Sequence, residues 1–235
     1  MRELAPGLWV VETPFRMYAF KLPQLGVEVG RRMIVCTLGS GELWINSPAP
    51  LTDEVRAWLD SLGQPRFVVA PNAVHGHRFM EAYRDAYPGV ELFAAPVLDR
   101  RRRDLAFDGV LGSAPDPRWS EELDQAMFAG HFVPEVVFLH RSSRTLIVGD
   151  LLTGRIPTAG LPLASRLYWG LEGLSRSAVV IRSYRLATVN RRTARRSLEQ
   201  ILAWDFDRIV VGHGEIVESG GRLVLGQAMR WLRSG

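Results

Sequence analysis

Short apolar runs separated by glycine, proline and polar residues fill the first half of the chain, as is typical of strands joined by turns. Residues 8–11, 17–20, 32–38 and 42–46 predict the strands of a β-meander, with a turn at Gly39–Gly41 between the last two. After a proline-rich break, Val55, Trp58 and Leu59 fall on one helical face. We therefore expect a helix that Thr52 or Asp53 caps and that ends before Gly63.

The next pattern is strand, loop, helix, strand. Apolar runs predict strands at 66–70 and 91–95, and an amphipathic segment at 79–86 predicts a helix between them. The histidine-containing loop 71–77 follows the first of these strands. Residues 96–130 are rich in arginine, aspartate and proline, which indicates a surface excursion with one short strand near 105–107.

The second half returns to apolar runs. Segments 136–139 and 146–148 flank a polar turn and predict a β-hairpin. A helix capped by Thr193 is expected over 194–204, before an apolar strand that begins at 208 and a short helix at 226–232. Because no repeat and no linker divides the pattern, we expect a single domain over residues 1–235.

Two of these strands end in a glycine followed by a polar side chain. The apolar run from Thr145 ends at Gly149 and Asp150, and the run from Arg208 ends at Gly212 and His213. A buried carboxylate without a partner costs several kcal/mol, so we expect a cationic or hydrogen-bonding partner for Asp150. A carboxylate and an imidazole that each follow a glycine at the end of an apolar strand indicate a metal site.

Composition narrows the class of protein. A hydrophobic content of 47% is ample for a packed core. The net charge of +4 comes from scattered arginines, and the dense run 100–103 is interpreted as a solvated helix end, so no nucleic-acid partner is expected. The single cysteine, Cys36, suits a reducing compartment, and no apolar run of about 18 residues exists. We therefore expect a cytoplasmic protein.

The order of these elements and side chains resembles the metallo-β-lactamase superfamily, on the side of ribonuclease Z and hydroxyacylglutathione hydrolase. The resemblance is carried by Gly130-His131 before the hairpin, Gly149-Asp150 at its end and Gly212-His213-Gly214 after the late strand. Within this superfamily, the chain is similar to a branch whose domain has no known function. The resemblance implies a four-layer αββα sandwich of two mixed β-sheets flanked by helices.

The chain departs from this superfamily in the His-x-His-x-Asp-His loop. If the loop is aligned from the end of the strand, Asn72, Val74 and Gly76 replace three ligands and only His77 remains. If His75 and His77 form the His-x-His pair instead, Phe79 and Met80 replace the last two ligands, listed in the order Asp and His. We prefer the first alignment because a helix should open directly after the motif.

Both alignments imply an incomplete metal site. The first leaves His77, Asp150 and His213, with His131 across from them, and the second leaves His75, His77 and His131 with Asp150. The resemblance therefore implies about one equivalent of zinc or another divalent metal, or none. Asp150 and His77 are the candidate catalytic residues.

Three functional hypotheses follow. The leading one is a hydrolase of an ester, thioester, amide or phosphoester that uses a metal-activated water. The alternative is a degenerate member that binds a small molecule or a protein partner without hydrolysis, with Asp150 held by an arginine such as Arg144 or Arg155. The third is membrane attachment through residues 161–185, where leucines and aromatics alternate with arginines, although a helical cover over the cleft is favoured there.

Overall fold

Two β-sheets packed face to face form the centre of the computed structural model, which describes residues 1–74, 76–174 and 177–232. The larger sheet has seven strands, in the order β1 (Arg2–Ala5), β2 (Leu8–Thr13), β5 (Arg31–Thr37), β6 (Glu42–Asn46), β7 (Gln64–Ala70), β8 (Glu91–Ala94) and β9 (Gly109–Val110). The smaller sheet has the order β10 (Leu123–Phe128), β11 (Glu135–His140), β12 (Thr145–Val148) and β13 (Arg208–Val211). Both sheets mix parallel and antiparallel pairs.

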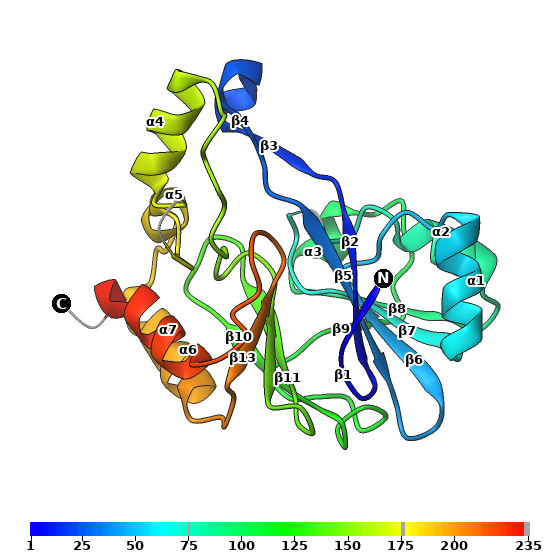
Figure 1. The fold of residues 1–235 in the computed structure, drawn as a ribbon. Coiled ribbons are helices and arrows are strands. Elements are labelled where there is room, and N and C mark those ends of the chain that lie inside the picture. The colour runs from blue at the N-terminus through cyan, green and yellow to red at the C-terminus, as the bar shows by residue number, and fades with distance from the viewer. Residues whose placement is uncertain (75, 175–176, 233–235) are drawn as a thin grey trace.

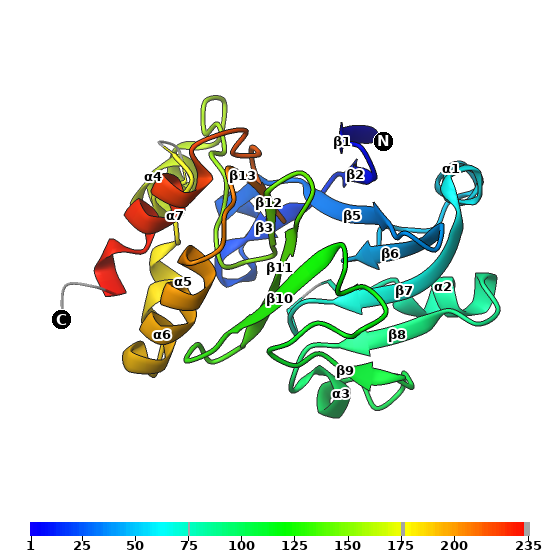
Figure 2. The ribbon, with the colours of Figure 1, turned by 90° about the horizontal axis from the view of Figure 1, so that it is seen from below.

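Helices cover the outer face of each sheet (Figure 1). On one side lie α1 (Asp53–Leu62) and α2 (Met80–Ala86), and on the other lie α6 (Arg191–Leu202) and α7 (Gly221–Ala228). Figure 2 shows the two sheets between these helix layers. Three apolar clusters fill the three interfaces, one under each helix layer and one between the sheets. The four-layer αββα architecture implied by the sequence resemblance is therefore confirmed.

Local sequence explains where the two long helices begin. The Thr52 hydroxyl accepts a hydrogen bond from the Val55 amide at 3.3 Å, so α1 has the expected side-chain cap. The cap of α6 is Asn190, whose side chain accepts from the Thr193 amide at 3.0 Å. The prediction of Thr193 as the cap was wrong, since Asn190 offers the same short side-chain acceptor three residues earlier.

The predicted β-meander is wrong in one respect. Strands β3 (Arg16–Tyr18) and β4 (Gly26–Glu28) pair only with each other and form a separate ribbon, while β2 pairs directly with β5. The ribbon tip contains two short helical turns, η1 (Ala19–Lys21) and η2 (Pro23–Leu25). In Figure 1 this ribbon rises away from the sandwich and lies beside α4 (Leu163–Glu172).

Smaller elements complete the chain. The strand expected near 105–107 is instead β9, a few residues later, and α3 (Leu98–Arg101) precedes it. The remaining elements are α5 (Arg182–Leu186) and η3 (Arg230–Leu232), and the last α-helix begins before the predicted residue 226. No helix in the described part of the chain is long and apolar enough to span a membrane.

Candidate functional site

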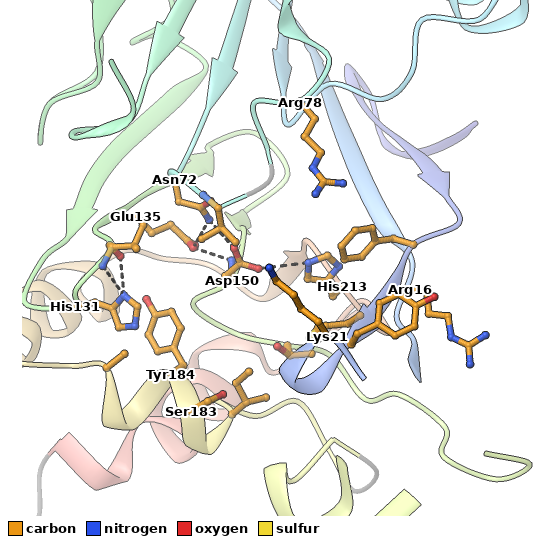
Figure 3. Close-up of a pocket in the computed structure, with 18 of the residues that line it drawn as sticks. Arg16, Lys21, Asn72, Arg78, His131, Glu135, Asp150, Ser183, Tyr184 and His213 are labelled. Atoms are coloured by element: carbon orange, nitrogen blue, oxygen red, sulfur yellow. Dashed lines mark hydrogen bonds and ion pairs between the residues drawn. The ribbon is translucent and has the colours of Figure 1, made fainter. Parts of the chain in front are cut away.

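A pocket of about 740 Å³ lies where the ribbon, the loop after β7, the ends of β12 and β13 and helix α5 meet. Its walls include the apolar side chains of Phe15, Met17, Val133 and Ile181. Asp150 and His213, the two strand-end residues singled out from the sequence, both line it (Figure 3). The pocket is therefore the candidate functional site.

The structure brings Asp150 and His213 together. One carboxylate oxygen of Asp150, Oδ1, lies 3.4 Å from Nε2 of His213. The other ring nitrogen, Nδ1, lies 2.6 Å from the Gly30 carbonyl oxygen, and Phe15 stacks on the ring at 5.4 Å between centroids. Because a carbonyl oxygen only accepts, Nδ1 carries a proton, and Nε2 faces the carboxylate.

The glycines before these two residues have a structural reason. The amide of Gly212 donates to the Gly149 carbonyl at 3.2 Å, where β12 and β13 run in parallel. A Cβ atom added at Gly212 would lie 2.8 Å from that carbonyl oxygen, which is closer than real side chains approach. Glycine thus lets the two strand ends meet backbone to backbone and sets Asp150 beside His213.

Asn72 ties the pocket floor together. Its amide nitrogen Nδ2 donates to Asp150 Oδ2 at 2.9 Å and to Glu135 Oε2 at 3.0 Å, and its Oδ1 accepts from the Val74 amide at 3.0 Å. Both donors and the oxygen of the side chain are therefore engaged. We call Asn72, Glu135, Asp150 and His213 the floor of the pocket.

Glu135 holds the turn that carries Asp150. The side chain is 1% exposed and accepts hydrogen bonds from the amides of Gly149, Asp150 and Leu151 at 2.7 to 3.3 Å. Burial, followed by the neighbouring Asp150 carboxylate, raises the pKa of Glu135 to about 7. A carboxylate that caps three backbone amides fixes the position of Asp150 rather than reacting itself.

His131 lines a different side of the pocket, which we call the wall, together with Tyr184. The two rings stack at 3.8 Å with an interplanar angle of 9°, and His131 Nδ1 lies against the Val133 backbone. Neither His131 Nε2 nor the Tyr184 hydroxyl has a hydrogen-bond partner among the described residues, and both atoms are buried. Burial raises the pKa of Tyr184 well above its usual value. Polar atoms of the wall thus lack hydrogen-bond partners among the described residues, whereas those of Asn72 and Glu135 in the floor have them.

Of the two loop histidines, the structure describes His77, which does not join the floor. His77 is not among the residues that line the pocket, and its Nδ1 accepts from Arg102 at 2.9 Å. The position of Asn72 next to Asp150 fits the first alignment of the loop, but the ligand role that this alignment left to His77 has no counterpart in the pocket. His75 lies outside the described residues.

The arginines proposed as partners of Asp150 pair elsewhere. Arg144 lies 2.6 Å from Asp205, and Arg155 lies 2.5 Å from Glu215. The pairing of Asp150 with Arg144 or Arg155 was therefore wrong, and among the described residues Asn72 and His213, which are remote in sequence, contact its carboxylate.

The described residues do not fit a metal centre. Over residues 1–74, 76–174 and 177–232 no group of three or more His, Cys, Asp or Glu side chains is close enough to hold an ion. In the first alignment of the loop, Asn72 replaces the first ligand, and in the structure its side chain is saturated with hydrogen bonds, while Val74 and Gly76 offer no side-chain donor. A catalytic zinc needs about three protein ligands, and the floor offers Asp150 and His213.

Sequence reasoning missed two of the residues that shape this site. Glu135 is a carboxylate at the start of a buried strand, just as Asp150 is a carboxylate at the end of one, so the same signal could have identified it. Tyr184 lies in a segment without clear periodicity, so nothing in the sequence placed it against His131.

Residues 161–185 contain α4, which packs on the ribbon. The Trp169 indole donates to the Leu25 carbonyl at 2.7 Å and the Ser165 hydroxyl to the Gly26 carbonyl at 2.6 Å. On the opposite face Leu163, Leu167 and Leu171 are 61%, 60% and 64% exposed. Helix α4 thus covers the ribbon, and within 161–185 the pocket is lined by Ile181, Ser183 and Tyr184. Membrane contact through the leucine row stays a prediction.

Solved structures share this architecture. No family model and no curated protein matches the chain. A metallo-β-lactamase from Pontibacter korlensis aligns with a TM-score of 0.67 at 12% identity, over 100% of this chain and 98% of that chain. One from Hirschia baltica gives 0.66 at 16%, over 98% and 95%. The mono-zinc form of FIM-1 from Pseudomonas aeruginosa gives 0.57 at 14%, over 98% and 94%. The chain therefore has the metallo-β-lactamase fold, as the sequence resemblance implied.

Proposed function

We propose that this protein uses the metallo-β-lactamase fold to bind a small amphipathic molecule in the pocket, without a metal and without hydrolysis. The observation that carries the proposal is Asn72. In the preferred alignment of the loop, Asn72 replaces the first metal ligand, and its side chain bridges Glu135 and Asp150 by hydrogen bonds. A floor closed by protein hydrogen bonds keeps its shape with no ion present.

The size and lining of the pocket support this proposal. A volume of about 740 Å³ falls within the range of roughly 300–1,000 Å³ typical of small-molecule sites. Such sites combine apolar walls with a few fixed polar groups. Here the apolar lining includes Phe15, Met17 and Ile181, and the fixed polar groups are those of the floor.

The test uses the neutral fluorescent probe N-phenyl-1-naphthylamine on chelator-treated protein. We expect saturable binding with about the same affinity in the presence of EDTA and after incubation with zinc. Absence of binding to the folded protein, or binding that requires zinc, would contradict the proposal.

Two neighbouring residues give a matched pair of variants. Ala187 lines the pocket, whereas Leu186 is 84% exposed and does not. Ala187→Trp should fill the cavity and weaken probe binding at least tenfold, while Leu186→Trp should leave it unchanged. Equal effects of the two substitutions would place the probe outside this pocket.

The second candidate function is metal-dependent hydrolysis of an ester, thioester, amide or phosphoester. It is favoured by the pair of Asp150 and His213, because two acceptor atoms 3.4 Å apart need a proton or a cation between them. Histidine ligands of metals usually donate their other nitrogen to a carbonyl, as His213 does to Gly30. His75, which follows the pocket residue Val74 in the sequence, would be the residue to add to this pair.

Hydrolysis is tested with nitrophenyl esters and phosphoesters in the presence of zinc, manganese or iron. Turnover that Asp150→Asn and His75→Ala each abolish would favour this second function over ligand binding alone. We expect no turnover above that of the Asp150→Asn variant.

A further inference from the structure

Three cationic side chains line the pocket, and they differ in their partners. Arg16 lies 3.6 Å from Glu28 and points away from Asp150 in Figure 3. Lys21 and Arg78 also line the pocket, but no carboxylate of the described chain lies within 4.0 Å of either charged group. Among these three pocket cations, Arg16 thus has a carboxylate partner in the described chain, and Lys21 and Arg78 have none.

A fourth cation, Arg31, is close enough to Arg78 for the two charges to repel each other. Arg31 is 6% exposed, its guanidinium carbon lies 4.6 Å from the centre of the Phe79 ring, and no described carboxylate is within 4.0 Å. Burial and the Arg78 charge lower the pKa of Arg31. The positive charges of Arg31 and Arg78 thus lie where the loop after β7 enters α2, and neither forms an ion pair within 4.0 Å among the described residues.

Lys21 approaches from the other side of the pocket. It lies in η1 at the ribbon tip, where Phe20 and Lys21 both have left-handed backbone angles, with φ of 51° and 58°. Such angles cost a non-glycine residue roughly 1–2 kcal/mol. In Figure 3 Arg78 enters the pocket from one side and Lys21 from the opposite side.

We propose that Arg78 and Lys21 form an anion subsite that binds the carboxylate or phosphate group of an amphipathic ligand. The subsite rests on the proposed ligand-binding function and names the class of ligand. The apolar part of the ligand lies along Phe15, Met17 and Ile181. The Asp150 carboxylate repels an anion from the floor, so the charged group of the ligand stays at the cationic side chains.

The test compares three probes with the same ten-carbon chain: decanoate, decyl phosphate and decan-1-ol. Each displaces the neutral probe N-phenyl-1-naphthylamine from wild-type protein. We expect decanoate or decyl phosphate to bind at least tenfold more tightly than the alcohol, and the better of the two identifies the anionic group.

Matched variants locate the effect. Arg78→Gln should remove most of this advantage, Arg78→Lys should keep part of it, and Arg16→Gln should keep it, because Arg16 already has Glu28 as a partner. Binding of the neutral probe by each variant shows that the pocket is intact.

Equal affinities of the anions and the alcohol would overturn the subsite while leaving the proposed ligand binding in place. An advantage that survives in Arg78→Gln, or that Arg16→Gln removes equally, would also overturn it. Failure of the neutral probe to bind would instead contradict the proposed function itself.

Discussion

The floor and the wall of the pocket satisfy their polar groups very differently. In the floor, Asn72 and Glu135 accept or donate hydrogen bonds with nearly all of their polar atoms. In the wall, the Tyr184 hydroxyl and His131 Nε2 are buried and have no partner among the described residues. A buried unpaired polar atom costs about 1–3 kcal/mol, whereas a satisfied network fixes one geometry. The floor therefore stabilises the fold, and the wall lowers its stability.

The largest expected effect is the loss of Glu135. In Glu135→Gln an amide group faces the backbone amides of Asp150 and Leu151, so donors meet donors in a buried site. We expect the free energy of unfolding to fall by about 3 kcal/mol, measured by urea denaturation. Glu122→Gln is the matched control, because Glu122 accepts from the Gly39 amide at 2.7 Å at the surface. If Glu122→Gln lost as much stability as Glu135→Gln, the buried hydrogen bonds of the floor would contribute no more than a surface hydrogen bond.

The raised pKa of Glu135 predicts how stability changes with pH. The folded state binds the proton with a pKa of about 7, against 4.5 for an unperturbed side chain. This contribution to stability is complete below about pH 4.5 and is lost as pH rises through 7, on the order of 3 kcal/mol. We expect urea titrations at pH 5 and pH 8 to show wild type losing stability relative to Glu135→Gln. If the stability of wild type relative to Glu135→Gln instead increased from pH 5 to pH 8, the amide donors would be keeping Glu135 ionised.

The smallest expected effect comes from the wall. Tyr184→Phe removes a buried hydroxyl without a partner and keeps the ring that stacks on His131. We expect the free energy of unfolding to stay the same or rise by about 1 kcal/mol. A decrease of more than 1 kcal/mol in thermal or urea unfolding would show that the hydroxyl is satisfied in solution, and the contrast with the floor would then disappear.

Local patterns in the sequence were enough for most of the fold. Strands β7, β11, β12 and β13 and helix α1 follow from apolar runs, caps and glycines that lie within a few residues of each other. The separate ribbon was not predicted, because whether β3 joins the sheet depends on packing against α4 and not on its own residues.

The site was predictable only in part. Asp150 and His213 were identified because each follows an apolar strand, and they do lie together. The bridge from Asn72 to Glu135 and Asp150 joins residues 63 and 78 positions apart, so no spacing rule reveals it. The ring of Tyr184 stacks on His131, and the Arg102 guanidinium contacts His77, and neither contact has a local signal.

The most direct test of the central claim is the zinc content of wild-type protein. Tag-free protein is incubated with zinc, passed through a desalting column and measured by elemental mass spectrometry. A floor closed by Asn72 predicts less than about 0.1 equivalents of retained zinc, because the described residues supply only Asp150 and His213 as adjacent donors. About one equivalent, lost in both Asp150→Ala and His213→Ala, would contradict the account and move the function to metal-dependent hydrolysis.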